Sequence, residues 1–227
     1  MKINTDFLYA DISGFYRTFR NVPVQITGIP VPGTTTTGIG TIVYGSNTPG
    51  LLYSLVLTPF GRGSALGGLT LAATGNYATG TYTQTNGCIY YTGGVTPVTY
   101  CVAADNFTGK KLARQPDFQT RISPAYKADF GRGTARIFDN LDYVGHRYSD
   151  MLQAQALRPY YALSAGVEAT YGDHWNLLVS GTNLTDQIGI TEINPRVSFG
   201  SGIPAPGPQL ARSIDGREVL VQLRYKF

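Results

Sequence analysis

Alternation of apolar and polar residues is the clearest regularity in this chain, and it is strongest at the C-terminal end. In residues 217–227 the apolar side chains fall on one parity and the polar side chains on the other, with Leu220 as the exception. The apolar set consists of Val219, Val221, Leu223, Tyr225 and Phe227. Because successive side chains of a β-strand point to opposite faces, this pattern predicts a strand with one apolar and one polar face.

Seven further segments have the alternation or the aromatic and β-branched composition of strands. Asp139 interrupts the alternation of one of them, and Pro124 lies inside another, where a central strand would lose a ladder hydrogen bond. The segments are residues 4–20, 51–60, 69–83, 117–130, 134–148, 159–171 and 174–184. With the terminal strand, the pattern predicts about eight strands.

The connections between these segments alternate between long and short. Residues 21–50 are crowded with Pro, Gly and Thr and are expected to form an irregular excursion with a short strand near residues 40–44. Residues 84–111 and 186–216 are the other long connections. Such alternation is typical of an antiparallel up-and-down transmembrane β-barrel, with short turns on one rim and long loops on the other. It places both termini on the periplasmic side.

This arrangement assigns each side chain to a face of the barrel wall. The side chains expected to face lipid are Ile122, Tyr126, Leu163, Val167, Leu177, Val221, Leu223 and Tyr225. The polar side chains expected to face the lumen are Arg121, Lys127, Asp129, Glu168, Gln222, Arg224 and Lys226. An aromatic girdle at the rim with short turns would consist of Phe130, Tyr171, Trp175, Tyr225 and Phe227.

Composition excludes several other classes of protein. No run approaches the roughly 18 consecutive apolar residues of a transmembrane helix, and the mean hydropathy is -0.08. The net charge of +4 comes from scattered basic residues, which gives no support to a nucleic-acid partner. With 28 Gly and 16 Tyr, the composition fits a β-barrel, but a large secreted β-sandwich would share it.

Candidate chemistry is sparse. Cys88 and Cys101 lie in one predicted extracellular loop and are expected to form a disulfide in an oxidising compartment, with free thiols or metal ligands as the alternative. His146 and His174 are expected near opposite rims, so no metal site and no cofactor are predicted. Asp142, His146 and Ser149 have only a generic spacing for a catalytic triad, and the chain is not expected to be an enzyme.

Three segments carry a family resemblance. The segments are NFTGKKLARQPDF (residues 106–118), residues 157–196, and GREVLVQLRYKF (residues 216–227), and they resemble the C-terminal third of TonB-dependent outer-membrane receptors. The most specific piece is the motif Asn183-Leu184-Thr185-Asp186, which follows an aromatic-rich strand. Members of this family form a 22-stranded barrel closed by an N-terminal plug, and import siderophore-bound iron or other scarce nutrients.

The resemblance implies that residues 1–227 are the C-terminal portion of such a barrel in the bacterial outer membrane, without the plug. No signal peptide is recognisable in MKINTDFLYA. Membrane lipid is an implied partner, whereas the inner-membrane energy-coupling complex would act only through the absent plug. A signal for the barrel insertion machinery is implied at Val221, Leu223, Tyr225 and Phe227. The alternative is a self-contained eight-stranded outer-membrane barrel with a structural or adhesive role.

Overall fold

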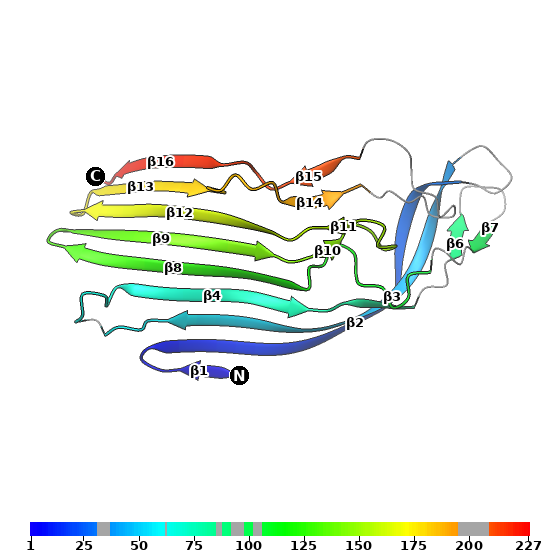
Figure 1. Cartoon of the computed structure of the whole chain (residues 1–227), viewed down its shortest axis with the longest axis horizontal. Coiled ribbons are helices and arrows are strands. Elements are labelled where there is room, and N and C mark those ends of the chain that lie inside the picture. Colours follow the sequence, from blue (N-terminus) through cyan, green and yellow to red (C-terminus); the bar gives the residue numbers. More distant parts are fainter. Residues whose placement is uncertain (31–36, 62, 85–87, 92–97, 102–105, 195–208) are drawn as a thin grey trace.

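One antiparallel sheet dominates the structure, a computed structural model that describes residues 1–30, 37–61, 63–84, 88–91, 98–101, 106–194 and 209–227 (Figure 1). Its main strands are β1 (Lys2–Asn4), β2 (Leu8–Pro30), β3 (Thr37–Leu57), β4 (Leu69–Ala78), β8 (Phe118–Phe130), β9 (Gly133–Val144), β12 (Tyr160–Tyr171), β13 (Trp175–Thr182) and β16 (Glu218–Tyr225). Apart from the short β1, these are the eight expected strands.

Seven shorter strands lie in the connections. They are β5 (Thr81–Gln84), β6 (Cys88–Tyr91), β7 (Val98–Cys101), β10 (Arg147–Tyr148), β11 (Ala156–Leu157), β14 (Ile190–Ile193) and β15 (Ala211–Ser213). β5 and β6 pair with β3 and β7 pairs with β6, whereas β10–β11 and β14–β15 form separate two-stranded sheets. Short hairpins therefore organise connections that the sequence pattern left irregular.

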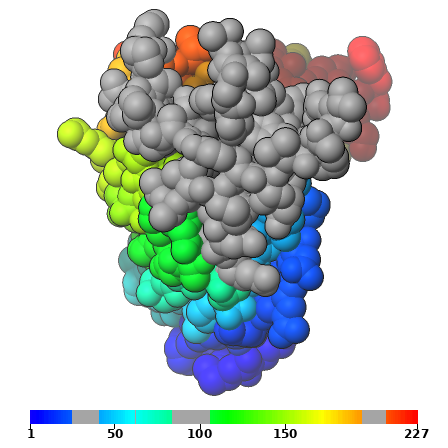
Figure 2. All heavy atoms as spheres, turned by 90° about the vertical axis from the view of Figure 1, so that its right-hand side faces the viewer, coloured from blue at the N-terminus to red at the C-terminus, as the bar shows by residue number. Residues whose placement is uncertain are grey.

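The main strands pair in chain order, from β1 through β2, β3, β4, β8, β9, β12 and β13 to β16. The all-β, up-and-down antiparallel fold predicted from the alternation is confirmed. Viewed from one end, the molecule curves from its blue N-terminal part through its green middle part to its orange and red C-terminal part (Figure 2). β1 and β16 lie at opposite ends of the order, and within the described residues they do not pair with each other. The sheet is therefore a curved, open wall.

The expected irregular excursion over residues 21–50 is wrong. β2 continues to Pro30 and β3 begins at Thr37, so the two strands form one long hairpin. Register shifts between Phe19 and Val22 and between Thr27 and Ile29 absorb the local irregularities. In the described residues, the part of β2 beyond Asp11 pairs only with β3. Proline is tolerated along such a free edge because no second neighbour needs its missing N–H.

The two ends of the sheet differ in the way predicted. The turns between β8 and β9 and between β12 and β13 lie at the same end as the C-terminus, which we call the turn end (Figure 1). Gly131 and Gly172 adopt positive φ angles of 54° and 57° in these turns, a conformation that costs glycine little. β10, β11, β14 and β15 lie toward the opposite end, which we call the loop end.

Cross-strand register divides the sheet into an apolar and a polar face. One apolar row runs through Leu69, Tyr126, Ile137, Val167, Val179 and Val221, each directly opposite the next. Ile137, Val167 and Val221 are 53%, 42% and 66% exposed. A soluble sandwich would bury such a row against a second sheet, so the exposed apolar face argues against that alternative. No helix among the described residues is long and apolar enough to cross a membrane.

Pro124 lies within β8, which is an inner strand between β4 and β9. The β8–β9 register includes Ile122 opposite Leu141 and Ala125 opposite Phe138, but it omits Ser123 and Pro124. Proline has no N–H to donate to the ladder. The interruption of the ladder is therefore local, and the strand continues across it.

Candidate functional site: the polar face and its flanking structures

An ion pair on the polar face occupies the middle of the described wall. Arg121 of β8 lies opposite Asp142 of β9, and its guanidinium donates two hydrogen bonds to the carboxylate, Nε to Oδ1 at 2.6 Å and Nη2 to Oδ2 at 2.9 Å. The two side chains are 57% and 31% exposed. A bidentate pair of this kind fixes the orientation of both groups more than it stabilises the fold, because solvent screens exposed charges.

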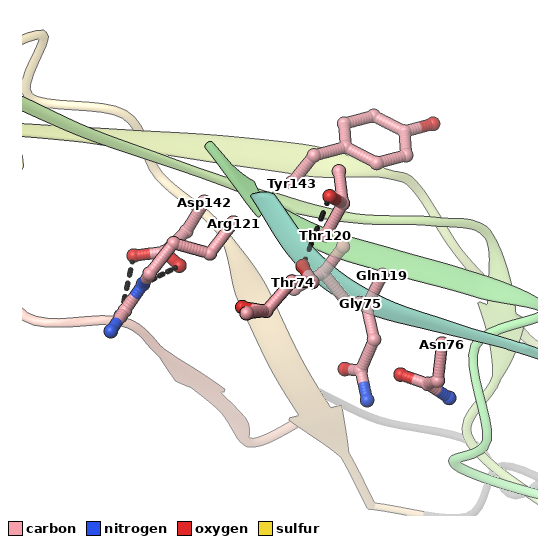
Figure 3. Close-up of a pocket in the computed structure, with 9 residues that line it drawn as sticks. Thr74, Gly75, Asn76, Gln119, Thr120, Arg121, Asp142 and Tyr143 are labelled. Carbon is pink, nitrogen blue, oxygen red and sulfur yellow. Dashed lines mark hydrogen bonds and ion pairs between the residues drawn. The ribbon is translucent and has the colours of Figure 1, made fainter. Parts of the chain in front are cut away.

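A shallow open cavity of about 290 Å³ adjoins this pair. The side chains of Thr74, Asn76 and Gln119 extend from the same side of the sheet as Arg121, whereas the ring of Tyr143 extends from the other side (Figure 3). Asn76 lies directly opposite Gln119 in the β4–β8 register. The cavity therefore offers a hydroxyl, two amides and a neutralised ion pair, which is chemistry suited to hydrogen-bonding groups.

Polar contacts continue across the face toward the turn end. Ser123 donates a hydrogen bond to Asn140 at 2.7 Å, and the Thr134 and Thr170 hydroxyls lie 2.8 Å apart. Asn176 donates to Glu168 at 3.1 Å. The polar face thus carries separate hydrogen-bonded pairs between β8 and β9, β9 and β12, and β12 and β13.

The predicted lumen residues that lie within strands share the parity of this face. Lys127 lies 3.9 Å from Asp129 and opposite Arg136, which in turn lies opposite Glu168. Gln222 and Arg224 lie opposite Leu178 and Asn176. In the described structure, the side chains of Gln222, Arg224 and Lys226 have no hydrogen bond or ion pair. Whether any of these residues contacts a ligand stays a prediction.

Sequence reasoning did not single out Asp142, Thr74 or Asn76 as partners of Arg121. Each lies at a polar position of an alternating segment, so its face could have been predicted. Its neighbour could not, because the register of β4 and β9 against β8 depends on long-range pairing.

The predicted girdle residues gather at the turn end. Gly133 lies between Phe130 on one neighbouring strand and Tyr171 on the other. Tyr171 lies opposite Trp175, and Trp175 lies opposite Tyr225. The rings of Trp175 and Tyr225 are 4.7 Å apart, and those of Tyr225 and Phe227 are 5.1 Å apart. The five aromatic side chains are between 44% and 104% exposed. Exposed rings in one row are typical of an interfacial belt.

β16 forms the last strand of the wall. Val221, Leu223 and Tyr225 lie opposite Val179, Leu177 and Trp175 of β13. His174 contacts the end of this strand, with its Nδ1 atom 2.8 Å from the Lys226 carbonyl oxygen. Among the described residues, the other edge of β16 has no partner strand.

Asn183 and Asp186 of the motif form a clamp between the end of β13 and the start of β16. Asn183 is 5% exposed, has a φ of 45°, and donates from Nδ2 to the Gln187 and Asp215 carbonyls at 3.0 and 2.9 Å. Its Oδ1 atom accepts the Gln187 N–H at 2.9 Å. Asp186 accepts the Arg217 N–H at 3.2 Å. The role of these two side chains is structural, because they satisfy backbone groups of the connection.

The other two residues of the motif lie between these anchors. Leu184 donates its N–H to the Leu163 carbonyl at 2.8 Å and packs its side chain against Gly181. Thr185 is exposed. The motif as a whole therefore fixes the loop that leaves β13.

A small hydrophobic core lies at the loop end. Ile42, Tyr82 and Phe107 are buried together, with Tyr44, Leu112, Met151 and Leu152 packed against them. Burial raises the pKa of Tyr82 to about 12, partly opposed by the hydrogen bond that its hydroxyl accepts from the Ala113 N–H. A second anchor is Arg147, which donates to the Ile190 carbonyl at 2.7 Å and whose pKa is lowered by burial.

No catalytic or metal cluster is assembled among the described residues. Asp142 is held by Arg121, and Ser149 lies within hydrogen-bond distance of Asp150 and Gln155. The His146 ring packs against Tyr148 at 5.0 Å. In the described ranges no three His, Cys, Asp or Glu side chains are grouped to hold a metal ion.

Cys88 and Cys101 lie directly opposite each other in the β6–β7 pair. This register suits a disulfide, because opposed residues of antiparallel strands have closely spaced Cα atoms. We expect an impermeant thiol reagent to label intact cells negligibly before reduction and clearly after it. Cys88→Ser is the control, since it should leave one thiol that reacts without reductant. Labelling of the unreduced wild-type protein would contradict the disulfide.

One solved structure shares this fold over the whole chain. A comparison with curated proteins finds no match. Among solved structures, BauA, the ferric preacinetobactin receptor from Acinetobacter baumannii, aligns over 100% of this chain with a TM-score of 0.65 and 13% identity. The ferric yersiniabactin uptake receptor FyuA from Yersinia pestis aligns over 98% of the chain with a TM-score of 0.46 and 16% identity. The chain spans 28% of the length of BauA and 35% of that of FyuA.

The likeness to BauA shows the fold, and the family follows from a second observation. The model of the TonB-dependent receptor-like β-barrel matches residues 1–184, which contain the strands from β1 to β13. Barrels of this family lie in the bacterial outer membrane, and its members are transport receptors. The chain belongs to the family of TonB-dependent receptor β-barrels.

Proposed function

We propose that residues 1–227 form the C-terminal part of the barrel wall of an outer-membrane receptor that imports siderophore-bound iron or another scarce nutrient with energy transmitted by TonB. The observation that carries the proposal is the family match over residues 1–184, together with a wall that has one exposed apolar and one polar face. In this arrangement the apolar face contacts lipid and the polar face contacts the lumen. Energy coupling would pass through a plug.

The open edges of the sheet favour this function over a self-contained eight-stranded barrel. Unpaired backbone groups facing lipid cost several kcal/mol each, and β1 and β16 are not paired with each other in the described structure. Both edges would be satisfied within a larger wall.

The test is energised uptake in cells that produce the whole receptor. Deleting its gene should abolish uptake of at least one substrate from a panel of radiolabelled ferric siderophores and cobalamin. Complementation should restore uptake only in a strain with functional TonB. Unchanged uptake of every substrate in an iron-starved deletion strain would contradict the proposal.

The Arg121–Asp142 pair is expected to affect transport more than stability. Arg121→Ala leaves the Asp142 carboxylate unpaired beside the cavity, and because the pair is exposed, the free energy of unfolding should fall by less than about 1 kcal/mol. Initial uptake rates should nevertheless fall, because the charge balance of the cavity changes. Ser13→Ala, on the same face but remote from the pair, is the control. An unchanged uptake rate for Arg121→Ala would contradict a role of the cavity in transport.

The terminal strand is expected to direct assembly. Deleting Phe227 should lower the amount of heat-modifiable, membrane-inserted receptor, because the family resemblance makes this end the segment recognised by the insertion machinery. Lys226→Ala, one residue earlier, should insert normally. Equal insertion of the two variants would exclude a special role for Phe227.

A further inference from the structure

Asp139 is a carboxylate on the apolar face of the wall. Its position in β9 has the same parity as Ile137 and Leu141, and it lies opposite Ala165 of β12. The other described apolar-face positions of β4, β8, β9, β12, β13 and β16 carry uncharged side chains. Arg20 of β2 has the same parity as Leu8, but it lies twelve positions along the strand from Leu8, at the bulge. Asp139 is therefore the one charged group on the described apolar face of β4, β8, β9, β12, β13 and β16.

The neighbours of Asp139 leave it accessible and unpaired. Ala165 flanks it on one side, and the interrupted β8–β9 register brings Pro124 to the other. Neither side chain can donate a hydrogen bond, and Pro124 has no N–H. The nearby Tyr126 hydroxyl donates to the Ala65 carbonyl at 2.7 Å. Within the described structure, the Asp139 carboxylate has no hydrogen bond or ion pair.

Asp139 also lies at a depth where lipid offers no partner. It is six positions along β9 from Gly133, which belongs to the aromatic row at the turn end. With a strand rise of about 3.4 Å and a tilt of about 40°, the carboxylate lies about 15 Å above that row, near the middle of an apolar band about 25 Å tall. Headgroups do not reach this depth, and an unpaired charge there is costly.

We propose that Asp139 marks a docking site for a membrane-embedded segment of a second protein that presents a Lys or Arg side chain at the same depth. The proposal rests on the proposed membrane location of the apolar face. A basic side chain complements the carboxylate in charge and supplies the missing donors. A second copy of this wall does not present such a side chain at this depth, because the described apolar face of β4 to β16 carries no basic residue and Arg20 lies twelve positions along β2 from Leu8. The small side chains of Ala165 and Pro124 permit close approach.

The test is site-specific photo-crosslinking in cells that produce the whole receptor. A benzophenone amino acid replaces Val167, which lies opposite Ile137 beside Asp139, or Leu177, which lies on the apolar face of β13 nearer the turn end. Val167 should give a discrete protein adduct, and Leu177 only lipid adducts. Asp139→Leu should reduce the protein adduct by at least about fivefold, whereas Asp139→Glu should retain it. Mass spectrometry should place a Lys or Arg next to the crosslinked residue of the partner.

The outcomes separate the docking site from the membrane location. Lipid adducts alone at both positions, or a protein adduct that Asp139→Leu leaves unchanged, would overturn the docking site while leaving the proposed function intact. No lipid adduct at either position would contradict the membrane location, and the docking site with it. Heat-modifiability of each variant verifies that the barrel has assembled.

Discussion

Val167→Arg is expected to lower the free energy of unfolding in lipid vesicles by about 2–4 kcal/mol, because the substitution places a guanidinium on the lipid-facing surface near the membrane midplane. Val167 is 42% exposed and is surrounded in its row by Ile137 and Val179. Asp139 is its diagonal neighbour on the same face, so Val167→Arg and its control are introduced into the Asp139→Leu variant, in which no carboxylate lies next to position 167. The charge would therefore face hydrocarbon, which has no hydrogen-bonding groups.

Ser164→Arg is the matched control for Val167→Arg. Ser164 is three residues away on the same strand, but it lies on the polar face opposite Asn140. A long cationic side chain at this position can remain in the hydrated lumen, so the change should be within about 1 kcal/mol. Urea titration of both variants in the same vesicles makes the comparison. Equal destabilisation would refute the assignment of the two faces.

Asn183→Ala is expected to lower the free energy of unfolding by about 3 kcal/mol, because it leaves buried backbone groups without partners. The substitution removes the two hydrogen bonds donated to the Gln187 and Asp215 carbonyls and the one accepted from the Gln187 N–H. It also places alanine at a φ of 45°, where a Cβ atom without a polar side chain is disfavoured. Hydrogen exchange should increase in residues 183–194 and 209–217.

Two further variants show which effect dominates at Asn183. Asn183→Gly accommodates the positive φ but lacks the side-chain hydrogen bonds, so it should remain destabilised if those bonds matter most. Gln187→Ala keeps the backbone groups that Asn183 contacts and should change stability by no more than about 0.5 kcal/mol. Wild-type stability of Asn183→Gly would refute the clamp.

Strand assignments from the sequence were most accurate where one face is apolar over the whole strand. The segment 159–171 corresponds to β12 (Tyr160–Tyr171), and the segment 217–227 contains β16 (Glu218–Tyr225). These strands could be predicted because the period-two pattern is local and needs no knowledge of the neighbours. The β2–β3 hairpin was missed because its Pro and Gly residues favour loops locally, whereas the long pairing with β3 overrides that preference.

For the candidate site, the sequence predicted which face of the sheet each side chain occupies but not which side chains it contacts. The alternation placed Arg121 on the polar face of its strand, but its bidentate contact with Asp142 depends on a register between two strands that no local pattern specifies. The Asn183 motif was recognised through the family resemblance, yet its contact with Asp215 joins residues that are 32 positions apart. The buried state of Asn183 follows from this long-range closure.

The order of strands and the division into apolar and polar faces follow from the amino-acid sequence, because side-chain alternation and turn residues act over a few neighbouring positions. The neighbours of each side chain follow only from strand pairing. For Asp139, the sequence indicates a break in alternation, whereas the register shows a lone carboxylate between Pro124 and Ala165 on an exposed apolar surface. Pairing is decided by the summed hydrogen bonds and contacts of whole strands, so these neighbours emerge only when the sheet is assembled.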